Sequence, residues 1–401
     1  MRPLPPLLPL DEALSLCLEL AVPIRRRETV PLSEVLHRIV AADVRAPLDV
    51  PPADRAAMDG YAVIARDTSR ARKFSPAALA VQENVHAGGV PTRRGAKGRC
   101  TQIATGAPMP RGTDAVVMVE DTERERDVVR VFRPVRPREN VSARASDIRK
   151  GSRVLARGER LTPAKLGALA AVGRQDVSVY ARPRVALLVT GDEVVPPGSR
   201  LRPGQVFDVN SHTMAAAVRE AGGEAVLLGR VPDRLDALRD ALDRARREDL
   251  VVFSGGSSVG EKDLVIDALR SLGDLLFHGV AIKPGRPTAL GRVRGKAVLG
   301  MPGNPTSCLS NCYILLAPML RRMARQPAPA GRALEVPLAA RIRSPRGRVQ
   351  VHTVRVVDGK AVPAFKESGA ITSMAHADGY IVIPADADHV DAGETVRVTL
   401  F

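Results

Sequence analysis

The chain of 401 residues contains no tryptophan, and aromatic residues make up only 3% of it. Proteins that bind single-stranded nucleic acid stack the bases on aromatic side chains, so surfaces of that kind are poorly supplied here. No apolar run is long enough to cross a bilayer. Met1 and Arg2 lead into a proline-rich segment rather than the apolar core of a signal peptide. We therefore expect a cytoplasmic protein that binds neither membrane nor nucleic acid.

Cysteine and histidine are also scarce. Cys17, Cys100, Cys308 and Cys312 show neither a zinc-site spacing nor the density of a disulfide scaffold. Cys308 and Cys312 lie four residues apart in a predicted helix, which is typical of buried packing. The seven histidines are scattered, without an HExxH motif. A transition-metal site is therefore not expected, whereas a hard cation held by carboxylates stays open.

The formal net charge is +16, and acidic residues interrupt many of the basic stretches, as in Glu123–Asp127. Charge spread along a whole chain usually indicates solvated faces, whereas a nucleic-acid footprint gathers on one face or tail. An anionic small-molecule substrate would benefit from the same positive field. The charge alone does not separate these alternatives.

The pattern of apolar residues changes along the chain and divides it into regions. Residues 10–21 have the spacing of an amphipathic helix, and residues 47–137 alternate short β-rich runs with turn clusters. From residue 184, continuous apolar strands alternate with helices, which predicts a parallel sheet covered on both faces. Short strands return after the proline-rich linker 326–329. The chain is thus predicted to be multidomain, of α/β plus β class.

Two proline- and glycine-containing loops end predicted strands. They are Lys283–Pro287, with the basic residues Lys283 and Arg286, and Met301–Pro305, in which Pro305 stands where an apolar helix begins. Proline fixes φ, and glycine lets a ligand approach the backbone closely. Each loop alone reads as an ordinary strand–helix turn. Together they favour a site for a phosphorylated or oxyanionic ligand.

Two further loops follow the strands 185–189 and 250–253. Thr190–Glu193 and the glycine-rich run from Ser254 to Gly260 would meet at the carboxyl ends of a parallel sheet, where such sheets bind ligands. Exposed backbone N–H groups there can bind an anion, and Glu193 with Asp263 could hold Mg²⁺. Helix capping is the alternative for each carboxylate. For Asp233 we expect capping, although it could also reach the same pocket.

Asp59 and Thr105 lie in the β-rich region. The segments around them, Ala57–Ala62 and Thr105–Pro108, favour turns on local evidence.

In combination, these motifs resemble those of one family. The segments in question are AMDGY (Ala57–Tyr61), TGAP (Thr105–Pro108), DAVVM (Asp114–Met118), DIRKG (Asp147–Gly151), TGDE (Thr190–Glu193), RPGQ (Arg202–Gln205), the run Ser254–Asp263, KPGRP (Lys283–Pro287), PGNP (Pro302–Pro305), Ser368–Ala370 and Ala377–Gly379. Their order across nearly the whole chain resembles that in the molybdopterin molybdenumtransferases, the MoeA and gephyrin E-domain family.

The resemblance implies a homodimer of four-domain subunits, with the active site between the α/β domain of one subunit and the β-rich domain of the other. The implied domains are a discontinuous N-terminal domain (1–48 and 141–181), a β-rich inserted domain (49–140), a three-layer α/β molybdopterin-binding domain (182–326) and a C-terminal β-barrel-like domain (327–401). The implied reaction inserts molybdate into the dithiolene of adenylylated molybdopterin and releases AMP, aided by Mg²⁺. A transient contact with the adenylyltransferase of the same pathway is also suggested.

Matching the motifs residue by residue gives the expected site. The catalytic positions are Asp59, Thr105, Asp147, Glu193, Asp233 and Asp263, of which Glu193 and Asp263 are expected to bind the cation. The substrate-binding positions are Thr190, Gly191, Ser254, Gly255, Gly256, Lys283, Pro284, Gly285, Arg286, Pro302, Gly303, Asn304 and Pro305. The sequence departs from the family pattern at Ala56, at Ala145–Ser146 and at Ser257, and the second departure weakens the assignment of Asp147.

Two other functions stay open. A molybdopterin adenylyltransferase would share a fold with residues 182–325, but it would not need the AMDG and TGAP segments. A scaffold or anion-binding protein without catalysis is the second alternative.

Overall fold

The computed structural model describes residues 6–255, 264–327 and 333–401. The chain forms two compact units: a larger one, made of Met1–Glu28, His37–Ile39 and Val179–Phe401, and a smaller one, made of Thr29–Leu36 and Val40–Ser178. The chain passes between them within β1 (Arg27–Pro31), on either side of His37–Ile39, and within β12 (Asp176–Tyr180). None of the described helices is long and apolar enough to span a membrane.

The larger unit contains a six-stranded sheet. Its order is β16 (Glu224–Val231), β13 (Arg184–Thr190), β17 (Leu250–Ser254), β21 (Lys296–Met301), β20 (Ala289–Val293) and β18 (Gly273–His278). The first four strands are parallel, but β20 and β18 are antiparallel to their neighbours. The predicted wholly parallel sheet is therefore mixed. The two-residue turn Arg294–Gly295, with positive φ at both residues, reverses the chain between β20 and β21.

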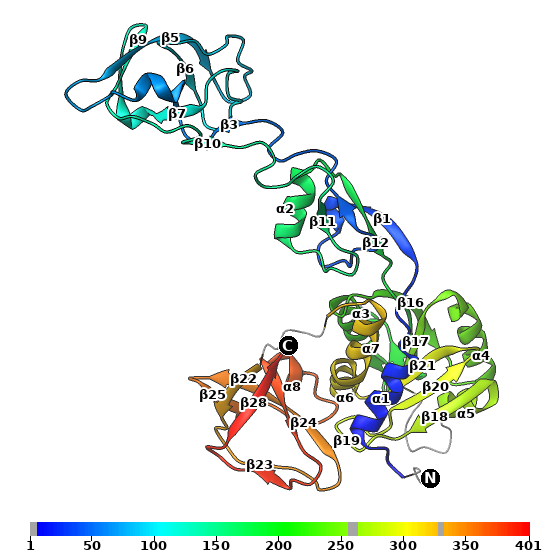
Figure 1. The fold of residues 1–401 in the computed structure, drawn as a ribbon. Helices are drawn as coiled ribbons and strands as arrows, with labels where there is room; N and C mark the ends of the chain where they lie inside the picture. The colour runs from blue at the N-terminus through cyan, green and yellow to red at the C-terminus, as the bar shows by residue number, and fades with distance from the viewer. Residues whose placement is uncertain (1–5, 256–263, 328–332) are drawn as a thin grey trace. The chain divides into compact units, whose positions relative to one another are not determined.

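Helices cover both faces of this sheet, as predicted (Figure 1). The cluster on one face includes residues of α1 (Leu10–Leu20), α3 (Asn210–Glu220), α6 (Pro305–Asn311) and α7 (Ala317–Met323), and that on the other face includes residues of α4 (Leu235–Arg244) and α5 (Leu264–Leu272). Cys308 and Cys312 are fully buried in the first cluster, which confirms their packing role. The π-helix η5 (Cys312–Leu316) separates α6 from α7. Pro318 follows it and has no N–H for a regular helical bond.

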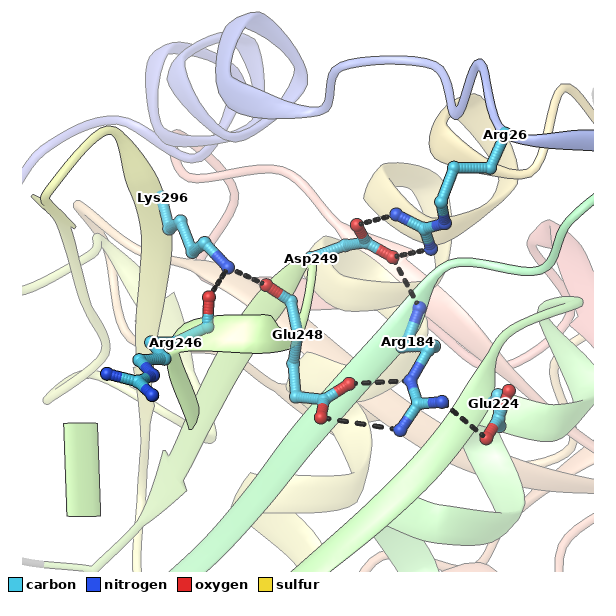
Figure 2. Close-up of polar contacts among 7 residues, drawn as sticks. All are labelled: Arg26, Arg184, Glu224, Arg246, Glu248, Asp249 and Lys296. Atoms are coloured by element: carbon cyan, nitrogen blue, oxygen red, sulfur yellow. Dashed lines mark hydrogen bonds and ion pairs between the residues drawn. The ribbon is translucent and has the colours of Figure 1, made fainter. Parts of the chain in front are cut away.

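An ionic cluster joins the amino ends of the strands (Figure 2). Both carboxylate oxygens of Asp249 accept bonds of 2.7 Å from Arg26, and the Arg184 N–H donates to the same carboxylate at 2.8 Å. The Arg184 side chain donates to Glu248 at 2.8 Å and lies 3.7 Å from Glu224. These contacts fix the amino ends of β13, β16 and β17. Open α/β sheets bind ligands at the opposite, carboxyl end of their strands.

The C-terminal part of the larger unit forms a second six-stranded sheet. Its order is β19 (Ile282–Lys283), β24 (Val349–Val357), β26 (Gly379–Ile383), β28 (Thr395–Leu400) and β22 (Ala333–Pro337), with β25 (Lys360–Pro363) paired to β24. A ribbon of β23 (Ile342–Arg343) and β27 (His389–Val390) and the short helix α8 (Thr372–Ala375) complete it. Because β19 belongs to this sheet, Lys283 is placed by the C-terminal strands.

The smaller unit is β-rich, as predicted. Its main sheet has the order β7 (Ala115–Met118), β4 (Gly60–Val63), β6 (Arg99–Ile103), β5 (Ala77–Val85), β9 (Val128–Val131) and β8 (Thr122–Glu125). The same unit also contains the pairs β10 (Val141–Ser142) with β3 (Arg55–Ala56) and β11 (Arg153–Leu155) with β2 (Val44–Arg45), and the helix α2 (Pro163–Ala171).

Candidate active site

A pocket of about 1240 Å³ lies in the larger unit, where β13, β17 and β21 end. It is lined by nearly all the residues that the loop motifs predicted there: Thr190, Gly191, Glu193, Asp233, Ser254, Gly255, Lys283, Pro284, Gly285, Arg286, Pro302, Gly303, Asn304 and Pro305. Gly256 and Asp263 lie outside the described residues. Parallel strands bring their carboxyl ends to one edge of a sheet, which explains how the segments after β13, β16, β17 and β21 meet. The Lys283–Arg286 segment reaches the same pocket from β19 of the second sheet.

The loops after β13 and β17 touch each other. Gly255 has φ +92°, and a Cβ there would lie 2.5 Å from the carbonyl oxygen of Thr190. Only glycine allows this close approach and this backbone conformation together.

Asn311 of α6 holds the Lys283–Pro287 loop in place through hydrogen bonds. The Asn311 side chain is fully buried, and its Nδ2 donates to the Gly285 carbonyl at 3.1 Å and to Thr288 Oγ1. The Thr288 hydroxyl donates to the same carbonyl at 2.7 Å. Gly285 has φ +112°, and the Lys283–Pro284 peptide bond is cis. The sequence predicted a stiff loop because of its prolines. The structure adds the hydrogen bonds of the buried Asn311 amide, which the motif did not reveal.

Asn210 performs a similar role on the other side of the pocket. It lies at the start of α3, and its Nδ2 donates to Ser254 Oγ at 2.7 Å and to the Gly303 carbonyl at 2.8 Å. One buried amide therefore joins the loop after β17 to the loop after β21. Sequence reasoning missed Asn210. The only signal was an asparagine at the start of a helix, where it reads as a cap.

The acidic side of the pocket carries Glu193 and Asp233. Partial burial, reinforced by the charges of Asp192 and Glu193, raises the pKa of Asp233. The N-cap of α4 is Arg234 and no side chain caps this helix, so the expected capping role of Asp233 is wrong. Glu193 lies between β13 and β14 (Val194–Val195), where no helix begins, so capping does not explain it either.

The C-terminal part of the larger unit forms one side of the pocket, which the sequence did not predict. Arg348 and the segment Phe365–Gly369 line the pocket together with the predicted loops. Asn304 Nδ2 donates to Ser368 Oγ at 2.9 Å, and Thr306 N donates to the Ser368 carbonyl at 3.1 Å. Arg348 and Lys366 thus bring two more cationic side chains to the pocket that contains Lys283 and Arg286. Within the described ranges, none of these four cations forms an ion pair. Of these residues, only Ser368 and Gly369 belong to one of the sequence motifs.

Three predicted residues belong to the smaller unit. Thr105 donates to Asp59 Oδ1 from its backbone N–H at 2.7 Å and from its hydroxyl at 3.0 Å, and these bonds lower the pKa of Asp59. The pairing of β4 with β6, in register at Gly60 and Ile103, brings the two residues together. Asp147 is exposed, and its backbone N–H donates to the Val50 carbonyl. Their participation in the pocket's chemistry stays a prediction.

Comparison with known proteins gives three domain matches and many full-length relatives. Residues 8–173 match the MoeA N-terminal region (domain I and II), residues 186–322 a probable molybdopterin binding domain, and residues 335–401 the MoeA C-terminal region (domain IV). The chain is 37% identical to molybdopterin molybdenumtransferase 2 of Mycobacterium tuberculosis, covering 92% of this chain and 94% of the relative. It is 33% identical to molybdopterin molybdenumtransferase of Haemophilus influenzae, covering 98% and 99%. The crystal structure of the molybdopterin biosynthesis moeA protein from Pyrococcus horikoshii OT3 is 33% identical, with a TM-score of 0.83 over 98% of this chain and 100% of that one.

Proposed function

The chain belongs to the MoeA family, and from that premise we propose that it is a molybdopterin molybdenumtransferase of molybdenum cofactor biosynthesis. In the proposed reaction it inserts molybdate into the dithiolene of adenylylated molybdopterin and releases AMP. The observation that carries the proposal is the composition of one pocket, which combines stiff cationic loops with two carboxylates. Both substrates are anionic and would bind to the cationic loops, and a cation bridging phosphate oxygens would bind to the carboxylates.

The cationic loops would bind the anionic groups. Lys283 and Arg286 lie on a loop whose backbone is fixed by Asn311, so their positions cost little ordering entropy on binding. Gly255 and Gly303 let phosphate or oxyanion oxygens approach the main chain on the opposite side.

The carboxylates Glu193 and Asp233 would hold a divalent cation, with Asp263 as a further proposed ligand. Within residues 6–255, 264–327 and 333–401, no three Asp, Glu, His or Cys side chains gather as a metal site. Mg²⁺, however, is commonly held by one or two carboxylates together with substrate phosphates. Burial, and then the negative charges of Asp192 and Glu193, raises the pKa of Asp233, and a bound cation would relieve the second cause. A bound cation would neutralise charge on the scissile phosphate.

We further propose that the protein is a cytoplasmic homodimer in which Asp59, Thr105 and Asp147 act on the pocket of the other subunit. A mixed dimer tests this, with Asp59→Ala in one subunit and Glu193→Ala in the other. About half of the sites should then combine two intact contributions, so activity absent from both parent variants should return. A mixture as inactive as its parents would contradict the shared site.

The reaction itself is tested by incubating the protein with adenylylated molybdopterin, Mg²⁺ and molybdate and measuring AMP release. Wild type should release AMP only when molybdate is present, and Glu193→Gln should be strongly impaired. Asp240→Asn is the matched control, because it removes one exposed carboxylate of α4 that does not line the pocket. Equal impairment in both variants would remove Glu193 from the site.

The same assay separates the alternatives. A molybdopterin adenylyltransferase would consume ATP and molybdopterin and would not release AMP from the adenylylated form. A scaffold or anion-binding protein would bind the ligands without turnover. The first alternative is disfavoured because the N-terminal and C-terminal MoeA regions match as well as the central domain.

A further inference from the structure

The main sheet of the smaller unit has one end that the proposed function does not use. Gly60 pairs with Ile103 at the end that carries Asp59 and Thr105. At the other end Val63 pairs with Ala115, and Ala62 pairs with Thr101. Because β4 runs antiparallel to β6 and β7, the loop after β4 and the loops before β6 and β7 all lie at this second end.

These three loops carry a dense set of cations. Residues 65–114 contain nine arginines and lysines and only three acidic residues, so this stretch is far more basic than the chain as a whole. The first loop contributes Arg66, Arg70, Arg72 and Lys73, and the second Arg93, Arg94, Lys97 and Arg99. Arg111 comes from the third. All nine are exposed, and we call them the basic loop surface.

Backbone contacts bring the loops side by side. The Gly98 N–H donates to Asp67 at 2.8 Å, which joins the second loop to the first. The Gly95 N–H donates to the Arg111 carbonyl at 2.8 Å, which joins the second loop to the third. The segments that carry the nine cations therefore adjoin one another at one end of the sheet.

The three carboxylates of this stretch are engaged with the backbone. Asp67 accepts from Gly98, Asp114 accepts from the Ala65 N–H at 2.7 Å, and Glu83 accepts from the N–H groups of Thr92 and Arg93 at 2.9 and 3.1 Å. In the described chain none of the nine cations forms an ion pair. The acidic residues hold the loops in place and leave the basic side chains without a carboxylate partner.

Elsewhere in the same unit, several arginines are paired with carboxylates. Arg133 contacts Asp121 and Glu139, both at 2.9 Å, and Arg144 contacts Asp49 at 2.6 Å. The nine cations of the basic loop surface have no carboxylate partner among the described residues. This concentration of unneutralised positive charge favours a surface whose negative charges come from another molecule.

Phe74 indicates the kind of molecule. Its side chain is 94% exposed, and Lys73 Nζ lies 5.9 Å from its ring centroid. Arginine with an exposed aromatic anchor is typical of protein interfaces. A single-strand nucleic-acid platform needs several aromatic side chains, and the basic loop surface offers one. We propose that the basic loop surface docks the acidic face of a partner protein, with Phe74 entering an apolar site on it.

Two labelled probes of equal charge test this proposal on the full-length protein. One is a peptide with seven glutamates and two leucines, and the other is a single-stranded RNA octamer with seven phosphates. The proteins compared are wild type, Phe74→Ala, the double variant Arg93→Glu/Lys97→Glu and the control Arg160→Glu/Arg174→Glu. The control changes two exposed residues of the same unit outside the surface. Fluorescence anisotropy at 0.15 M salt gives the affinities, and circular dichroism checks folding.

We expect the peptide to bind wild type more tightly than the RNA does. The Arg93→Glu/Lys97→Glu variant should lose about ten-fold or more in peptide affinity, and the control should lose little. Phe74→Ala should weaken the leucine-containing peptide but not a peptide of glutamates and glycines. Tighter binding of the RNA would overturn the proposal in favour of a nucleic-acid surface. Equal effects of the charge variant and its control would overturn it in favour of a solvated face.

Discussion

Gly285→Ala is the perturbation that most directly probes how the pocket fixes its basic residues. Gly285 has φ +112°, and an added Cβ would lie 2.5–2.8 Å from the side-chain atoms of Asn311. The matched control is Gly295→Ala in the turn between β20 and β21, where φ is +80° and a Cβ would meet nothing within 4 Å. Both variants carry a positive-φ alanine, but only the first displaces a neighbour.

The cost of each change follows from these contacts. A positive φ costs a non-glycine residue about 1–2 kcal/mol, and each variant pays at least this penalty. Gly285→Ala also disrupts the bonds from Asn311 to the Gly285 carbonyl and to Thr288, at about 0.5–1.5 kcal/mol each. The expected loss in the free energy of unfolding is therefore about 2–5 kcal/mol for Gly285→Ala and about 1–2 kcal/mol for Gly295→Ala.

Urea unfolding measures these losses, and titration with molybdate and with AMP measures binding. Because Lys283 and Arg286 flank Gly285, we expect Gly285→Ala to weaken oxyanion binding by about ten-fold or more, roughly 1.4 kcal/mol. Gly295→Ala should bind as wild type does. Equal losses of stability, or unchanged binding in Gly285→Ala, would refute the view that the Asn311 contact positions this loop.

Three other predictions concern charge and loop stiffness. Lys283→Ala should weaken molybdate binding by about ten-fold or more and Pro302→Ala by about two- to five-fold, and titrations at two salt concentrations should show that only the lysine effect shrinks with salt. Because the pKa of Asp233 is raised in the folded protein, wild type loses stability as pH rises from 3.8 through that pKa. The Asp233→Asn variant should therefore have a higher melting temperature than wild type at pH 7 and bind Mg²⁺ less well. A lower melting temperature would contradict this. Burial, and then the charge of Lys283, lowers the pKa of His352 to about 4 from 6.5. Wild type should therefore lose up to about 1.4 kcal/mol per pH unit as pH falls from 6.5 to 4, because only the unfolded chain binds the proton there, and His352→Gln should show a flatter dependence in urea unfolding.

The sequence was most informative where one local pattern decides the structure. The apolar run Val185–Val189 predicted a buried strand and lies in β13, and the periodicity of residues 10–21 predicted α1. The Pro305 helix start was also confirmed, with the proline in the first turn of α6. The loop motifs predicted the pocket because consecutive parallel strands place their carboxyl ends together whatever their spacing in the sequence.

What could not be predicted depends on contacts between distant segments. Asn210 and Asn311 are ordinary helix residues in the sequence, and their bonds to pocket loops arise only when α3 and α6 pack beside the sheet. The basic wall residue Arg348 has no motif of its own. Charge along the chain also looked dispersed, because sequence does not reveal which arginines form ion pairs. The excess of basic residues in 65–114 is present in the sequence, but only the structure shows that their loops adjoin and that the carboxylates bind the backbone.

The most direct test of the proposed function is the ratio of molybdenum inserted to AMP released in a single turnover. Adenylylated molybdopterin, Mg²⁺ and molybdate are mixed with excess protein, and the pterin product is separated and its metal measured by mass spectrometry. A molybdenumtransferase should yield equal molar amounts of AMP and of molybdenum bound to the pterin, rising together in time. Release of AMP without molybdenum in the product, or no release while both ligands bind, would contradict the function proposed here.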